Sequence, residues 1–183
     1  SADYWDMLNS LPPDLALAWR DGDWDVFEGQ FFTELRREIH GFTGDPPPGW
    51  TFRCLDYGES APSAVYWCRV DYDGDVWLYR ELYGAGMIYS VLADRIKALT
   101  PTGEDIRYTV ASPDIFAKSR GTGVVGSETL NNAGVPVIPA DNNRIEGWRQ
   151  FKEFLHHRRL HVSLDACRNW WRTVPAMIYD TTH

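Results

Sequence analysis

Residues 64–83 read AVYWCRVDYDGDVWLYRELY, and they carry the strongest structural signal in the chain. Aromatic and β-branched residues dominate 64–70 and 76–83, which is typical of β-strands. The intervening Asp71-Tyr72-Asp73-Gly74 has the residue types of a tight hairpin turn. The sequence therefore predicts two antiparallel strands joined by a short turn.

The segments on either side of this hairpin extend it into a larger sheet. A buried strand is expected ahead of it at 52–57, and a helix at 88–99 follows, with apolar residues at helical spacing. An antiparallel meander followed by alternating helices and strands predicts an α/β fold, with a mixed β-sheet flanked by helices. The alternating units are strands at 106–111, 135–139 and 160–162, and helices at 127–132, 143–156 and 165–174.

The helix expected at 143–156 is amphipathic. Asn142 or Asn143 has the side chain of a helix N-cap. The apolar residues repeat at helical spacing, so we expect four of them to face the core. These are Ile145, Trp148, Phe151 and Leu155.

The first 45 residues differ from the rest in composition. They are acidic and helix-like, with a short helix expected at 14–19. The run Asp45-Pro46-Pro47-Pro48-Gly49 suits neither a helix nor a central strand. We therefore expect a boundary near residue 45, with an arm at 1–45 and the main domain at 46–183.

The net charge of −8 is concentrated at one end of the chain. Residues 1–60 hold 12 acidic and 4 basic side chains, whereas residues 61–183 hold 14 of each. Because phosphate binding needs Lys and Arg, the domain on its own is expected to bind nucleic acid only weakly. A run of about 18 apolar residues, as a membrane helix needs, is absent from the sequence.

The three cysteines, Cys54, Cys68 and Cys167, lack the spacing of a metal site. We expect reduced thiols, as in a cytoplasmic protein. The start of the chain has neither an initiator Met nor a basic segment followed by an apolar one. It reads as an internal piece of a longer protein, without a signal peptide.

Two aspartates follow predicted strands. Asp56 ends the strand at 52–57, and Asp114 comes just after the strand at 106–111. If those strands are neighbours, the two carboxylates meet at one edge of the sheet and form a hard-oxygen site for Mg²⁺ or Mn²⁺. Paired divalent ions are one way to cleave a phosphodiester. The competing interpretation is two ordinary turns.

Glu81, at the end of the strand at 76–83, is a weaker candidate. It is either a further metal ligand or a structural group that pairs with a neighbouring side chain. The structural role is the better supported of the two, since a carboxylate inside a strand readily pairs with a cation.

The loop Gly121-Thr-Gly-Val-Val-Gly126 matches GxGxxG by letter, but the residues before it are not strand-like. A dinucleotide site is therefore not expected, and no P-loop motif occurs in the chain. The flanking Lys118 and Arg120, with Arg144, Arg149 and Lys152 on the long helix, are candidates for contacts with a nucleic-acid backbone. A solvated helix face is the alternative for the last three.

Taken together and in order, several segments resemble the large subunit of bacteriophage terminases, from its joining segment through its C-terminal nuclease domain. The resemblance covers nearly the whole chain. The matching segments are Trp19-Arg20-Asp21-Gly22-Asp23-Trp24-Asp25, Gly29-Gln30-Phe31-Phe32, Leu55-Asp56-Tyr57-Gly58, Tyr79-Arg80-Glu81-Leu82-Tyr83, Ser112-Pro113-Asp114, residues 141–148, Cys167-Arg168-Asn169 and Arg172-Thr173-Val174-Pro175.

That resemblance implies a ribonuclease H-like fold and an endonuclease that cuts concatemeric viral DNA with two divalent metal ions, Mg²⁺ or Mn²⁺. The first metal-binding acid of the family corresponds to Asp56. The second often falls where this chain has Ser112, so that Asp114 is the available carboxylate. The third follows a His-rich segment that this chain does not reach.

The resemblance also implies partners: double-stranded DNA, an ATPase half joined through residues 1–45, a small terminase subunit and a portal. Two alternatives remain open. One is a non-catalytic docking module of the packaging motor, with the tryptophans as contact surface. The other is a different ribonuclease H-like enzyme, such as a transposase or junction resolvase.

Overall fold

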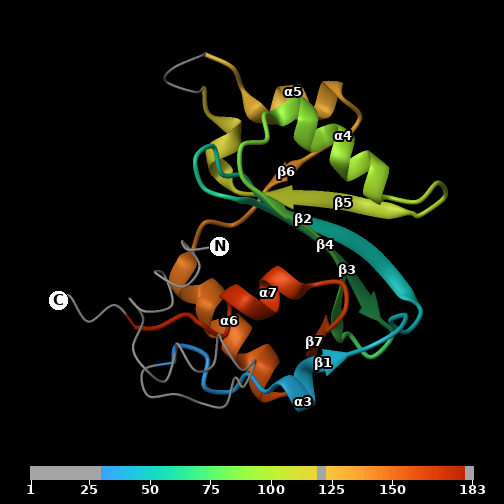
Figure 1. Cartoon of the computed structure of the whole chain (residues 1–183), viewed down its shortest axis with the longest axis vertical. Helices are drawn as coiled ribbons and strands as arrows, with labels where there is room; N and C mark the ends of the chain where they lie inside the picture. The colour runs from blue at the N-terminus through green and yellow to red at the C-terminus, as the bar shows by residue number, and fades with distance from the viewer. Residues whose placement is uncertain (1–29, 119–122, 180–183) are drawn as a thin grey trace, which may run out of the picture.

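The computed structural model describes residues 30–118 and 123–179, which form a single mixed sheet with helices on both faces (Figure 1). The strand order is β1-β7-β4-β3-β2-β5-β6. The strands are β1 (Gly41–Phe42), β2 (Gly49–Asp56), β3 (Ser63–Asp71), β4 (Val76–Gly84), β5 (Ile106–Ala111), β6 (Ile138–Pro139) and β7 (Leu160–Ser163). The helices are α3 (Arg37–His40), α4 (Tyr89–Leu99), the 3₁₀ helix η1 (Pro113–Phe116), α5 (Gly126–Asn132), α6 (Arg144–His156) and α7 (Arg168–Thr173).

The predicted hairpin is confirmed as β3 and β4, which pair antiparallel from Ser63↔Gly84 to Val70↔Val76. Its turn is held by Asp71, whose Oδ1 accepts from the backbone N–H of Asp73 at 3.0 Å and of Asp75 at 2.9 Å. A carboxylate that satisfies two turn amides in this way is typical of Asp at the first position of a turn.

The remaining strands add to this meander in both directions. Strand β2 pairs antiparallel with β3, and β5 and β6 then continue the sheet in parallel. On the other side, β7 pairs parallel with β4, and β1 with β7. The expected mixed sheet, antiparallel first and parallel after, is therefore confirmed.

Alternate residues of the strands pack into two separate hydrophobic cores, one on each face of the sheet. Val65 and Trp67 face α4, α5 and η1, whereas Cys68 and Leu78 face α6 and α7. Figure 1 shows α4 and α5 on one side of the sheet and α6 and α7 on the other. Period-2 alternation of buried residues is what a sheet covered on both faces requires.

The inward face expected for α6 is wrong at Ile145, which is 84% exposed, and at Trp148, which is 40% exposed although its ring contacts Phe31 and Phe32. The helix packs through its C-terminal half, where Leu155 is its fully buried residue, and its first turns reach beyond the core. The expected N-cap is confirmed, because the Asn143 side chain accepts from the backbone N–H of Glu146.

The strand expected at 135–139 is shorter than predicted. Val135 and Val137 are buried, but their backbone N–H groups donate to the Leu130 carbonyl and to Asn131 Oδ1 at the end of α5. With those donors occupied, sheet pairing begins only at Ile138.

Part of the expected arm belongs to this fold. Phe32 and Leu35 are buried in the core beneath α6 and α7, and β1 adds a strand to the sheet. His40 is also buried, with its Nε2 2.9 Å from the carbonyl oxygen of Leu155. The helix expected at 14–19 lies outside the described residues. Within the described part of the chain, no helix has the length and apolar character that crossing a bilayer requires.

Candidate active site

Asp56 is the last residue of β2 and is exposed to solvent. Leu55 before it is buried and pairs with Val65 on one side and Ala111 on the other. The strand is therefore held on both sides up to the position before the carboxylate. Such a residue is fixed by the backbone while its side chain remains free to bind a ligand.

The neighbouring parallel strand ends at the same level. The backbone N–H of Ser112, the first residue after β5, donates to the Leu55 carbonyl at 3.1 Å. Asp114 follows two residues later in the first turn of η1 and is exposed, while Ile115 is buried and anchors the turn. Asp56 thus ends one of two adjacent parallel strands and Asp114 follows the other, which meets the condition under which the sequence placed both at one edge.

A third carboxylate lies at this edge and was not singled out from the sequence. Strand β6 pairs parallel with β5, and the N–H of Ala140 donates to the Ala111 carbonyl at 2.8 Å. Asp141 comes next, exposed, with its Oδ1 accepting from the backbone N–H of Asn143. The signal that could have found it is its position directly after a parallel strand.

Glu81 is occupied elsewhere. Its Oε1 accepts from the backbone N–H and the side-chain amide of Asn169, at 3.0 and 2.8 Å, and its Oε2 accepts from the N–H of Trp170 at 2.7 Å. These are free amides of the first turn of α7, where a carboxylate is favoured. Its contacts support the structural interpretation.

Asp56 and Asp114 fit a divalent cation by donor type. Both are solvent-facing carboxylates on a rigid edge, and hard oxygen ligands are those that Mg²⁺ and Mn²⁺ prefer. Across residues 30–118 and 123–179, no three His, Cys, Asp or Glu side chains converge closely enough to hold an ion. The three cysteines are all free thiols.

The basic candidates differ in how far they are already engaged. Arg149 binds Glu146 through two hydrogen bonds of 2.9 and 2.6 Å, which with a further bond from Gln150 lower the pKa of Glu146 to about 2. Lys152 donates to the Tyr179 hydroxyl at 2.9 Å and lies 4.5 Å from the centroid of the Phe31 ring.

Lys118 and Arg144 are exposed. Lys118 forms an isolated backbone bridge with Val125 at the mouth of the loop that carries the GxGxxG letters. Arg144 begins α6, directly after the Asn143 cap and close in sequence to Asp141. Arg120 lies outside the described residues.

Neither a protein-family model nor a curated protein matches the chain. Solved structures do match. The P22 large terminase nuclease domain superposes with a TM-score of 0.65 at 16% identity, over 84% of this chain and 85% of that one. The large terminase nuclease of thermophilic phage G20c, with bound magnesium, gives 0.58 at 15% identity over 86% and 85%.

The large terminase of thermophilic bacteriophage D6E, in complex with ATP-gamma-S, gives a TM-score of 0.70 at 18% identity. That alignment covers 87% of this chain but 40% of the D6E protein. The chain therefore spans most of an isolated nuclease domain and less than half of a whole large terminase. By its structure, this chain has the ribonuclease H-like fold of bacteriophage large terminase nuclease domains.

Proposed function

We propose that the chain is the DNA endonuclease domain of a phage or prophage terminase large subunit, which cuts concatemeric viral DNA during genome packaging. The observation that carries the proposal is the pair Asp56 and Asp114 at the carboxyl ends of adjacent parallel strands, in a chain with this fold. The resemblance noted in the sequence identifies Asp56 as the first acid and leaves Asp114 as the available carboxylate for the second.

Asp56 and Asp114 would hold two divalent ions, Mg²⁺ or Mn²⁺. Bound there, such ions supply a nucleophilic water at neutral pH and stabilise charge on the leaving oxygen. Support comes from the G20c nuclease, whose structures contain cobalt and magnesium. The residues of this chain contribute the fixed position of the carboxylates, because β2 is paired on both sides up to Leu55.

Positioning of the DNA falls to the basic residues. Contacts from Lys118, Arg120 and Arg144 to phosphates would hold the duplex without reading its sequence. Arg149 and Lys152 would contribute less, since each already has a partner in this structure.

The larger assembly is part of the same proposal. An ATPase half, a small terminase subunit and a portal would bring the DNA to this domain in the cytoplasm of the host. The D6E large terminase, which this chain matches over 40% of its length, has been solved with ATP-gamma-S and with ADP.

The test is cleavage of supercoiled plasmid by the purified chain in Mn²⁺ or Mg²⁺, with EDTA as the metal-free control. Asp56→Ala should abolish cleavage. Asp94→Ala, which removes an exposed carboxylate on α4 away from the strand ends, should keep it. Calorimetric titration with Mn²⁺ provides a second readout, in which Asp56→Ala should lose binding.

Three outcomes would overturn the proposal. Cleavage that persists in EDTA is one, and full activity of Asp56→Ala is another. The third is an intact chain that neither binds Mn²⁺ nor cleaves DNA, which is the behaviour expected of a docking module.

A further inference from the structure

Three aromatic rings lie side by side on β2 and β5, on the sheet face that also carries α6. The ring centroids of Trp50 and Phe52 are 5.5 Å apart, and those of Phe52 and Tyr108 are 5.4 Å apart with an interplanar angle of 29°. Trp50 and Tyr108 close the group at 6.0 Å. We refer to these three residues as the aromatic platform.

The platform is not a closed core. Tyr108 is 37% exposed, and Trp50 and Phe52 are half-buried. Helix α6 covers the side of the sheet near β7 and β4, and a groove of about 380 Å³ separates it from β2. Phe52 and Cys54 form the β2 side of that groove, and Gly147 and Gln150 form its α6 side.

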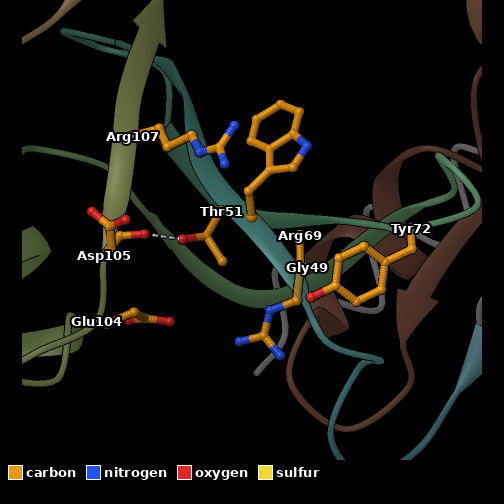
Figure 2. Close-up of a pocket in the computed structure, with 8 residues that line it drawn as sticks. Gly49, Thr51, Arg69, Tyr72, Glu104, Asp105 and Arg107 are labelled. Atoms are coloured by element: carbon orange, nitrogen blue, oxygen red, sulfur yellow. Dashed lines mark hydrogen bonds between the residues drawn. The ribbon is translucent and has the colours of Figure 1, made fainter.

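One arginine side chain, that of Arg107, lies against the rings. The guanidinium carbon of Arg107 lies 5.0 Å from the centroid of the Trp50 ring. Arg107 on β5 and Arg69 on β3 both line a pocket of about 390 Å³ that Trp50 also lines (Figure 2), but Arg69 pairs with Thr51 and lies with it on the opposite face of the sheet to the rings. The Nε of Arg69 is buried without a hydrogen-bond partner. Exposed rings and guanidinium groups together are the usual surface for nucleic-acid bases and phosphates.

Two acids line the same pocket. Glu104 is already paired, since its carboxylate binds Arg80 at 2.6 Å and the Tyr79 hydroxyl at 2.7 Å. Asp105 is exposed, and it accepts a hydrogen bond from Thr51 through its backbone carbonyl (Figure 2). The two cations are therefore opposed by one carboxylate, that of Asp105, which has no partner among the pocket residues.

The platform is aligned with the candidate active site. Trp50, Phe52, Cys54 and Asp56 occupy alternate positions of β2 and so lie on one face of the strand. Four residues of extended strand span about 13 Å, which separates Phe52 from Asp56. A nucleic-acid strand lying along β2 would reach the carboxylate end while its bases contacted the rings.

We propose that the aromatic platform stacks the bases of an unpaired DNA strand next to the bond that is cut, with Arg107 beside its phosphates. The inference rests on the proposed nuclease function, and it adds that the substrate has a locally unpaired strand. Stacking on rings does not depend on base identity, so the platform would bind many sequences.

The test is fluorescence anisotropy with fluorescein-labelled dT12 and a labelled 12-base-pair duplex, at low salt in EDTA, where cleavage is suppressed. The protein is the full chain carrying Asp56→Ala. Adding Trp50→Leu and Tyr108→Ala should weaken binding to dT12 by about tenfold or more, given the usual contribution of each stacked ring. Ile88→Ala, which removes an exposed apolar side chain at the start of α4 on the opposite side of the sheet, should leave it within about twofold.

Tighter binding of dT12 than of the duplex, lost in the platform variants alone, supports the inference. Equal binding of the two probes, or dT12 binding unchanged in the platform variants, overturns it. Thermal melts of all variants confirm that they are folded. A chain that cuts plasmid but does not bind dT12 refutes the platform only, and one that binds dT12 but never cuts refutes the nuclease only.

Discussion

The backbone N–H of Ser112 donates to the carbonyl oxygen of Leu55 at 3.1 Å, one residue beyond the last paired position of β5. This bond sets the point where the chain leaves the sheet. It places Ser112 beside Asp56. The first exposed carboxylate after β5 is therefore that of Asp114, in η1. The candidate site is therefore offset by two residues from the position at which the family resemblance locates its second acid.

The offset leads to a prediction that separates the two positions. Asp114→Asn should lower Mn²⁺-dependent plasmid cleavage by about 100-fold, because a metal ligand loses its charge. Ser112→Ala keeps the backbone bond to Leu55 and should stay within a few-fold of wild type. Initial rates of nicking measure both. Equal losses in the two variants would show that Asp114 has no special part in the reaction.

Glu81 provides a prediction about stability. Glu81→Ala removes the acceptor of three hydrogen bonds at the start of α7 and should lower the free energy of unfolding by about 1–3 kcal/mol. Glu153→Ala, which removes an exposed helical carboxylate, is the control and should change it by less than about 0.5 kcal/mol. Urea unfolding checks both. A Glu81→Ala chain of wild-type stability with impaired Mn²⁺ binding would instead identify Glu81 as a ligand.

Replacing each of two helical glycines by alanine should change the stability of the fold in opposite directions. Gly147 lies inside α6, and a Cβ there would meet no atom within 4 Å, so Gly147→Ala should stabilise the chain by about 1 kcal/mol. A Cβ on Gly126 would clash with the ring of Tyr89, which is stacked on Tyr57 at 4.0 Å. Gly126→Ala should therefore destabilise by about 1–2 kcal/mol. Melting temperatures that shift in the same direction would contradict this.

The burial of His161 leads to a prediction about how the free energy of unfolding depends on pH. Burial lowers the pKa of His161 below its usual 6.5, although Asp75 opposes the shift, and the ring stacks on Trp77 at 3.9 Å. Below pH 6.5 the unfolded chain binds a proton that the folded chain excludes, so this contribution to stability is lost as pH falls towards the folded pKa. Unfolding free energies at pH 7.5, 6.5 and 5.5 measure the slope.

His161→Gln should flatten that slope between pH 6.5 and 5.5. A slope that is unchanged in His161→Gln would assign the effect to other groups.

The hairpin and the order of elements could be predicted from the sequence because they depend on local signals. Period-2 patterning and the Asp71 turn define β3 and β4, and the Asn143 cap marks the start of α6. Asp56 could be predicted for the same reason, because the sequence alone shows a carboxylate at the end of a buried strand.

The features that could not be predicted from the sequence depend on contacts between segments that are far apart in the chain. That β1 pairs with β7 cannot be read from two residues, Gly41 and Phe42. The exposure of Ile145 follows from where α6 crosses the sheet, which its own periodicity does not report. The aromatic platform was missed because Tyr108 and Phe52 become neighbours only when β5 is placed beside β2.

The two outermost strands of the described sheet, β1 and β6, are only two residues long, and β6 ends in Pro139, which has no backbone N–H to donate. Long unpaired edges let sheets of different molecules join and aggregate, and short or proline-containing edges discourage this. We expect copies of this domain to resist joining into continuous sheets even at high local concentration.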